Sequence, residues 1–134
     1  MFRLATLTSV LTALACAPAI AEKHGVLRVG VMNDMSGVYS DFQGAGSVLA
    51  AQLAVEDFAK QSRRKAEVLV GDHLNKPDVG TAIARRWLEV EGVDMIIDLP
   101  NSAVALGVAD IVRERNKVVI GSGAGTSLLT GEKC

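Results

Sequence analysis

The sequence is poor in the residues that several common functions require. Aromatic residues make up 4% of the 134 residues, which argues against the aromatic platforms that stack on single-stranded nucleic acid. Fourteen basic and 15 acidic side chains give a net charge of −1, so charge favours neither nucleic acid nor an anionic membrane surface as a partner. The length allows one domain at most, and the apolar content of 49% is sufficient for a core.

Catalytic and nucleotide-binding motifs are also missing. His24 and His73 have neither metal-ligand spacing nor a partnered nucleophile, so we interpret both as surface residues. The glycine-rich stretch Gly121–Gly125 fits neither GxGxxG nor the P-loop pattern. The sequence therefore predicts no nucleotide cofactor and no catalytic triad.

The N-terminus has the pattern of a secretory signal peptide. One positive charge precedes the apolar run Leu4–Ala15, and Ala19-Ile20-Ala21 is a small-x-small cleavage site. The pattern predicts a signal peptide at residues 1–21 and a mature chain at residues 22–134. A membrane anchor is the alternative, because the 18 uncharged residues of Leu4–Ala21 are the lower limit for a span.

Cysteine occurs twice. Cys16 lies in the predicted signal and leaves a lipoprotein signal as a third option, although Ala13-Leu14-Ala15 matches that pattern poorly. Cys134 is then the single cysteine of an exported chain. We interpret it as an exposed thiol or as half of a pair completed beyond this sequence, and as a first sign of truncation.

The mature chain alternates between strand and helix patterns. Strands are expected at Val26–Met32, Ala66–Asp72, Val93–Leu99 and Val118–Ile120, and helices at about 43–62, 77–91 and 103–115. In the first helix we expect Leu53, Phe58 and several alanines on the buried side. In the second we expect burial of Val79, Ile83, Trp87 and Val90, and Gly92 as the stop.

This order predicts an α/β fold with a doubly wound, Rossmann-like parallel sheet in which the first strand lies between the second and third. Right-handed crossovers bring the loops after the strands to one edge, where open α/β sheets bind ligands. We expect Asp34–Phe42 and Leu99–Ser102 to flank the crevice. Ser122–Thr126 is expected at the same edge.

Three acids end strands: Asp34, Asp72 and Asp98. They could bind Mg²⁺ and support an exported hydrolase, or simply hydrogen-bond their own loops, as aspartate does in turns.

Two loops are rich in hydrogen-bond donors. Ser122, Thr126 and Ser127 offer hydroxyls beside exposed backbone N–H groups, which suits a carboxylate or another small anion. Ser102 is expected to cap the third helix and to add donors at its N-terminus. Tyr39 and Phe42 follow the first strand. They could line the apolar side of a ligand, or they could simply fill space within the domain.

Four stretches together match a known pattern: LRVGVMNDMSGVYSDFQG, AAQLAVEDF, HLNKPDVGTAIARRWLEVEGVDMIIDLPNSAVALGVADI and NKVVIGSGAGTSLLTGEKC. On these, Val26–Cys134 resembles the first lobe of periplasmic ABC-transporter substrate-binding proteins of the leucine/isoleucine/valine-binding type. The resemblance implies a type I periplasmic binding fold in which two lobes hinge around a cleft. Residues 22–134 would be the N-terminal lobe, incomplete, with the second lobe absent and with the partner of Cys134 further on.

The resemblance also implies the contacts to the solute. Ser102, with Asn101 beside it, and the Ala-x-Thr positions Ala124 and Thr126 would hold a carboxylate. Phe42, with Tyr39 nearby, would contact the apolar part of the solute.

The function implied is capture of a small organic solute for an ABC permease of the inner membrane, in the periplasm and without catalysis, cofactor or metal. Leu99–Ala105 departs from the serine-rich loop of the branched-chain amino-acid binders, so amides and organic or aryl carboxylates stay open beside amino acids. The ligand-sensing domain of a receptor is a further alternative, because it shares the fold.

Overall fold

The computed structural model describes residues 25–62 and 64–133. The predicted signal peptide, Cys16, His24 and Cys134 lie outside these residues. The elements are β1 (Leu27–Asn33), α1 (Gly44–Gln61), β2 (Ala66–Asp72), α2 (Pro77–Arg86), the π-helical turn η1 (Trp87–Glu91), β3 (Met95–Asp98), α3 (Ser102–Glu114), β4 (Val118–Gly121) and the 3₁₀ turn η2 (Ser127–Leu129).

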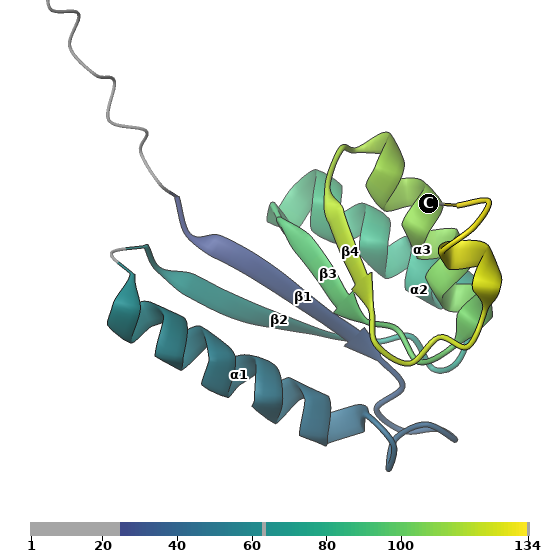
Figure 1. The fold of residues 1–134 in the computed structure, drawn as a ribbon, viewed down its shortest axis with the longest axis horizontal. Coiled ribbons are helices and arrows are strands. Elements are labelled where there is room, and N and C mark those ends of the chain that lie inside the picture. The colour runs from purple at the N-terminus through teal and green to yellow at the C-terminus, as the bar shows by residue number, and fades with distance from the viewer. Residues whose placement is uncertain (1–24, 63, 134) are drawn as a thin grey trace, which may run out of the picture.

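The four strands form one parallel sheet in the order β2-β1-β3-β4 (Figure 1). β1 therefore lies between β2 and β3, as the sequence predicted. The register pairs Asn33 with Asp72 and Met32 with Asp98. Because the strands run in parallel and end close to the same level, the loops that follow them lie together at one edge of the sheet.

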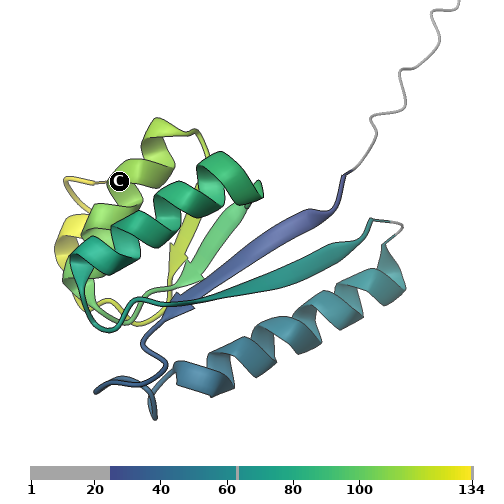
Figure 2. The ribbon, with the colours of Figure 1, turned by 180° about the vertical axis from the view of Figure 1, so that it is seen from behind.

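The helices divide between the two faces of the sheet. α1 lies on one side, and α2 and α3 lie on the other, side by side (Figures 1 and 2). The main hydrophobic core fills the space between the sheet and the α2–α3 pair. It consists of Met32, Ala84, Trp87, Val93, Ile96, Leu99, Val104, Ala105, Val108, Ile111 and Val112.

Trp87 is the largest side chain of this core, and its predicted burial is confirmed at 1% exposure. Its ring lies directly on the backbone of β1 and of the neighbouring edge strand β2. A Cβ added to Gly30 of β1 would lie 2.4 Å from Trp87 Cζ3, and one added to Gly71 of β2 would lie 2.8 Å from Trp87 Cζ2. The two glycines thus provide the space in which the indole packs.

The burial predicted for Leu53 and Phe58 in α1 is wrong, whereas the predicted burial of alanines is confirmed for Ala51. Leu53 and Phe58 are 53% and 38% exposed, and the buried residues of the helix are Gly44 and Ala51. The helix is alone on its face of the sheet, where it packs on β1 and β2, so only a narrow stripe of small side chains reaches the strands.

Val90 is also wrongly predicted as buried, since it is 77% exposed. The chain leaves α-helical geometry at Trp87 and continues as the π-helical turn η1. A π turn holds more residues than an α turn, so Val90 rotates away from the face that carries Trp87. Gly92 ends this segment in the left-handed region at φ 66°, as predicted.

Within residues 25–62 and 64–133, no helix combines the length and the apolar content that crossing a bilayer requires.

We expect Gly30→Ala to destabilise the protein by about 1–3 kcal/mol, because the new methyl group overpacks the core against Trp87. Gly25→Ala is the matched control, since a Cβ there meets nothing within 4 Å. Urea unfolding measures both. Equal stability of the two variants would contradict the packing described for Trp87.

Candidate functional site

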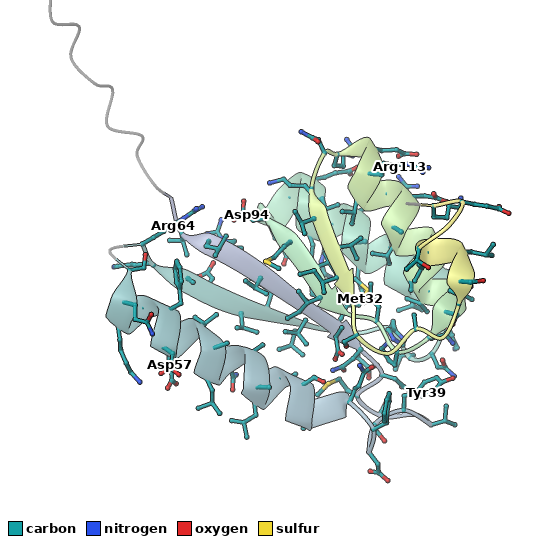
Figure 3. The ribbon with its side chains drawn as sticks, in the orientation of Figure 1. Met32, Tyr39, Asp57, Arg64, Asp94 and Arg113 are labelled. Atoms are coloured by element: carbon teal, nitrogen blue, oxygen red, sulfur yellow. The ribbon has the colours of Figure 1, made fainter. Side chains whose placement is uncertain are left out.

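The loops after the strands form one cluster at the carboxyl edge of the sheet. Tyr39, in the loop after β1, lies at this edge, whereas Arg64 and Asp94 lie towards the opposite end of the sheet (Figure 3). Tyr39 is half-buried and Phe42 is 68% exposed. The centre of the edge is the point between β1 and β3 where the winding of the sheet reverses, which is the usual ligand position in such folds.

Two strand-end carboxylates shape the loop after β1. Asp34 is fully buried and accepts hydrogen bonds from the backbone N–H groups of Gly37 (2.9 Å) and Tyr39 (3.1 Å). Asp72 accepts from Met35 N at 3.2 Å and Ser36 Oγ at 2.9 Å, and it also accepts from the backbone of its own loop. Burial tends to raise the pKa of Asp72, but these hydrogen bonds outweigh it and hold the pKa below its ordinary value.

The third carboxylate, Asp98, bonds to Asn33 and Ser122. In the described part of the chain, no three His, Cys, Asp or Glu side chains come together in a group that could hold a metal ion. The hydrogen bonds that Asp34 and Asp72 accept from loop N–H groups agree with the second of the two interpretations given above.

The loop after β3 leads into the N-terminus of α3. Asn101, and not Ser102, is the N-cap: its Oδ1 accepts from the N–H groups of Ala103 (2.8 Å) and Val104 (3.0 Å). The Asn101 side-chain amide also donates to Asn75 in the loop after β2. Ser102 is the first residue of the helix and is half-exposed. The predicted cap was thus one residue too late, and Ser102 lies at the surface of the edge.

The same loop begins with an unusual backbone. Asp98 and Leu99 have φ values of 92° and 62°, a region in which side chains other than glycine cost about 1–3 kcal/mol each. The Leu99 side chain is fully buried in the core, and the Asp98 carbonyl accepts from Ser122 N at 2.8 Å. Core packing and the contact with the loop after β4 therefore hold this turn in place.

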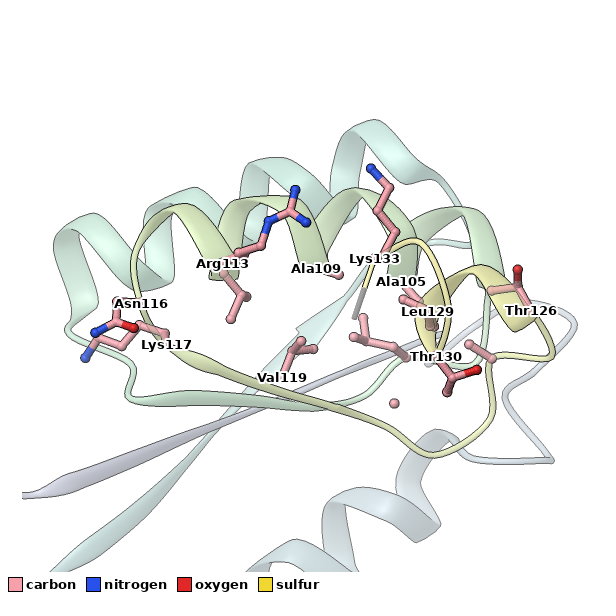
Figure 4. Close-up of a pocket in the computed structure, with 14 residues that line it drawn as sticks. Ala105, Ala109, Arg113, Asn116, Lys117, Val119, Thr126, Leu129, Thr130 and Lys133 are labelled. Carbon is pink, nitrogen blue, oxygen red and sulfur yellow. The ribbon is translucent and has the colours of Figure 1, made fainter.

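A groove of about 490 Å³ runs between α3 and β4 (Figure 4). Two of the candidate residues, Ala124 and Thr126, line it at the end nearest the loop cluster, and Thr126 Oγ1 also accepts from Leu128 N at 3.3 Å. The groove continues to Asn116 and Lys117, which precede β4. It follows the outer edge of β4 and does not reach the other four candidates, Tyr39, Phe42, Asn101 and Ser102.

His73 is fully buried, which corrects its interpretation as a surface residue. The chain turns sharply after β2 and places His73 against α2, where a Cβ on Gly80 would lie 3.5 Å from His73 Cβ. His73 Nδ1 accepts from Asn75 N at 3.0 Å. Burial lowers the pKa of His73, and the negative charges of Asp34 and Asp72 offset this shift only in part.

Comparison with known proteins identifies the family. Residues 26–134 match the model of a periplasmic binding protein family. The chain belongs to the periplasmic binding proteins. No curated protein sequence matches it.

Solved structures agree with this assignment. A periplasmic binding protein from Burkholderia mallei is 38% identical, with a TM-score of 0.76. A branched-chain amino-acid ABC transporter periplasmic ligand-binding protein from Burkholderia xenovorans is 37% identical, also with a TM-score of 0.76. In both cases the match covers 81% of this chain and 29% of the other. The chain therefore spans less than a third of the length of these proteins and corresponds to the first lobe of their type I fold.

A more distant structure shares the fold alone. It is a solute-binding protein of an ABC transporter from Rhodopseudomonas palustris, solved with 3,4-dihydroxybenzoic acid, and it is 22% identical with a TM-score of 0.66. The match covers 81% of this chain and 30% of that protein.

Two residues of this periplasmic binding protein that shape the loop cluster were not among the predicted ones. Asn33 is fully buried at the end of β1, and Gln43 directly precedes α1, where its side chain bonds to Ser122. A polar residue that ends an apolar strand, such as Asn33, is the one sequence signal that could have indicated this role.

We expect the stability of this periplasmic binding protein to fall as the pH decreases below about 6.5, the ordinary pKa of histidine. Because the pKa of His73 is lowered in the folded state, the unfolded chain takes up a proton that the folded chain does not. This contribution is fully present above pH 6.5 and is lost below it. His73→Asn keeps an acceptor for Asn75 N but does not titrate, so its unfolding free energy should depend less on pH just below 6.5.

Urea unfolding of both proteins at a series of pH values measures the difference. Asp72 adds acid sensitivity in both proteins at lower pH, because its pKa is also lowered. Identical slopes just below pH 6.5 would show that His73 is not the group responsible.

Proposed function

We propose that this chain forms the solute-binding first lobe of a protein that captures a small organic carboxylate in the periplasm and delivers it to an ABC permease of the inner membrane. The observation that supports this most strongly is the family match over residues 26–134. The fold adds a second argument, because its half-exposed donors lie at the edge where parallel α/β sheets bind ligands.

The carboxylate of the solute is proposed to lie between the start of α3 and the loop after β4. Ser102 offers its hydroxyl beside the N-terminus of α3, whose dipole favours a negative charge. Thr126 offers a second hydroxyl and is half-exposed. Ala124 and Asn101 complete this side of the site, since Ala124 packs on the core and Asn101 fixes the first turn of α3.

The rest of the solute is proposed to contact the loop after β1. Phe42 exposes most of its ring to solvent, and Tyr39, three residues earlier, is half-buried. An exposed aromatic ring at a cleft edge loses water contact when a solute or a second lobe covers it, which favours binding.

The names of two similar proteins support the proposed class of solute. One relative carries the name of a branched-chain amino-acid transporter protein, and the more distant one was solved with an aryl carboxylate. A carboxylate is common to both classes. The similar proteins are binding proteins and not enzymes, and we propose that this protein likewise releases its solute unchanged.

We expect Ser102→Ala and Thr126→Ala each to weaken binding of the solute about tenfold to a hundredfold. Each removes a hydrogen bond to a charged group, which contributes about 1.5–3 kcal/mol. Isothermal titration calorimetry of the full-length gene product with leucine and with 3,4-dihydroxybenzoic acid measures the effect. Ser62→Ala is the control, because Ser62 lies beyond the far end of α1. If all three variants bound as tightly as the unmodified protein, the site assignment would be wrong.

We also expect the mature protein to begin at Glu22 and to be recovered in the periplasmic fraction. N-terminal sequencing after osmotic shock tests this in cells that express the full-length gene. Recovery in the membrane fraction with residues 1–21 still attached would instead support the anchor alternative.

A further inference from the structure

A closed ring of hydrogen bonds joins the ends of three strands to the start of α1. Asn33 Nδ2 donates to Asp98 Oδ2 at 3.0 Å and to the Gly44 carbonyl at 2.9 Å. Ser122 Oγ donates to Asp98 Oδ1 at 2.6 Å and accepts from Gln43 Nε2 at 2.7 Å. The peptide bond between Gln43 and Gly44 closes the ring.

The ring lies at the point where the winding of the sheet reverses, and it crosses that point through the Asn33–Asp98 bond. Three residues of the ring lie at the boundaries of three different loops. Gln43 ends the loop after β1, Asp98 ends β3 directly before its loop, and Ser122 begins the loop after β4. These three loops, together with Ser102 at the start of α3, carry the proposed contacts to the solute.

The ring is rigid where it meets the sheet. Asn33 and Asp98 are 0% and 5% exposed, and a hydrogen bond is stronger in such surroundings than in water. Asp98 itself has the left-handed backbone conformation described above, and both of its carboxylate oxygens accept hydrogen bonds. Loss of both oxygens at position 98 would therefore remove the bonds to Asn33 and to Ser122 at once.

We propose that Asp98 is the positioning residue of the solute site: through the ring it fixes the spacing of the three binding loops before the solute arrives. The inference rests on the proposed function. Asp98 touches no solute in this account and acts through Ser122, Asn33 and Gln43.

The direction of the hydrogen bonds gives a sharp test. The Gln43 amide donates to the Ser122 hydroxyl, and that hydroxyl donates to Asp98. Ser122 therefore needs a donor on one side and an acceptor on the other. Gln43→Glu places acceptors on both sides and two carboxylates around one hydroxyl. Adding Asp98→Asn reverses the direction, because the new amide at position 98 donates to Ser122 and Ser122 donates to the new carboxylate at position 43. The amide oxygen at position 98 still accepts from Asn33.

The measurement is the affinity of the full-length gene product for leucine and for 3,4-dihydroxybenzoic acid, well below the melting temperature of every variant. We expect Gln43→Glu to weaken binding about tenfold, as for coupled groups in one network. Asp98→Asn alone should change affinity less than about threefold, because the Gln43 amide can flip to accept from Ser122. The double variant should recover to the level of Asp98→Asn.

The double variant also separates positioning from direct contact. If Gln43 bound the solute itself, Asp98→Asn could not rescue Gln43→Glu, and the failed rescue would overturn the proposal. Unchanged affinity in Gln43→Glu would overturn it as well. If the unmodified protein binds neither probe, the proposed solute class fails instead.

Amide hydrogen exchange without solute tests the ring independently of that outcome. We expect Gln43→Glu to speed exchange in the loops at 36–43 and 122–126 together, and the double variant to restore slow exchange. Exchange unchanged by Gln43→Glu would overturn the proposal even if no solute is known.

A matched pair of glycines tests the ring without altering any polar group. A Cβ on Gly123 would lie 2.8 Å from Gln43 Nε2, whereas one on Gly46 meets nothing within 4 Å. Gly123→Ala should therefore displace the Gln43 amide and weaken binding, and Gly46→Ala should not. Equal affinity of the two variants would contradict the ring as the positioning element.

Discussion

Most of this structure follows from one constraint, the right-handed crossover between parallel strands. It brings every loop that follows a strand to one edge of the sheet, and it places α1 opposite α2 and α3. Several backbone N–H groups in these loops bond to side chains instead of to backbone carbonyls, because a buried N–H group needs a partner. Asp34, Asp72 and Asn101 provide these side chains. The polar residues that end the strands are thus a requirement of the fold before they serve any ligand.

A binding site that is ordered in advance loses less entropy when a ligand enters. The turn at Asp98 and Leu99 is held by core packing below it and by hydrogen bonds from Asn33 and Ser122 beside it. The same residues therefore stabilise the fold and fix the shape of the edge at which we place the solute. In a two-lobed protein, this rigidity would leave the hinge as the part that moves.

The sequence was sufficient for the sheet order, the helices and the burial of Trp87, because these depend on local periodicity and on handedness. It was insufficient for features that depend on contacts with residues distant in sequence. Asn101 and Ser102 are both good caps, and only the path of the chain after Leu99 selects Asn101. The burial of His73 depends on how closely α2 passes over it, and the exposure of Val90 on a π turn that has no sequence signal. Of the candidate site, the loops could be predicted, but the hydrogen bonds between them join residues up to 79 positions apart.

The helices on the two faces of the sheet bury unequal amounts of apolar surface. α2 and α3 bury a continuous core around Trp87, whereas α1 buries only Gly44 and Ala51. Elements with few buried apolar contacts open at a lower free energy than the rest of a protein. We therefore expect α1 to detach before the sheet unfolds, and it would take Gln43 away from Ser122 as it does so. Occupancy of the solute edge and docking of α1 would then be thermodynamically linked, so that a bound solute protects a helix it does not touch.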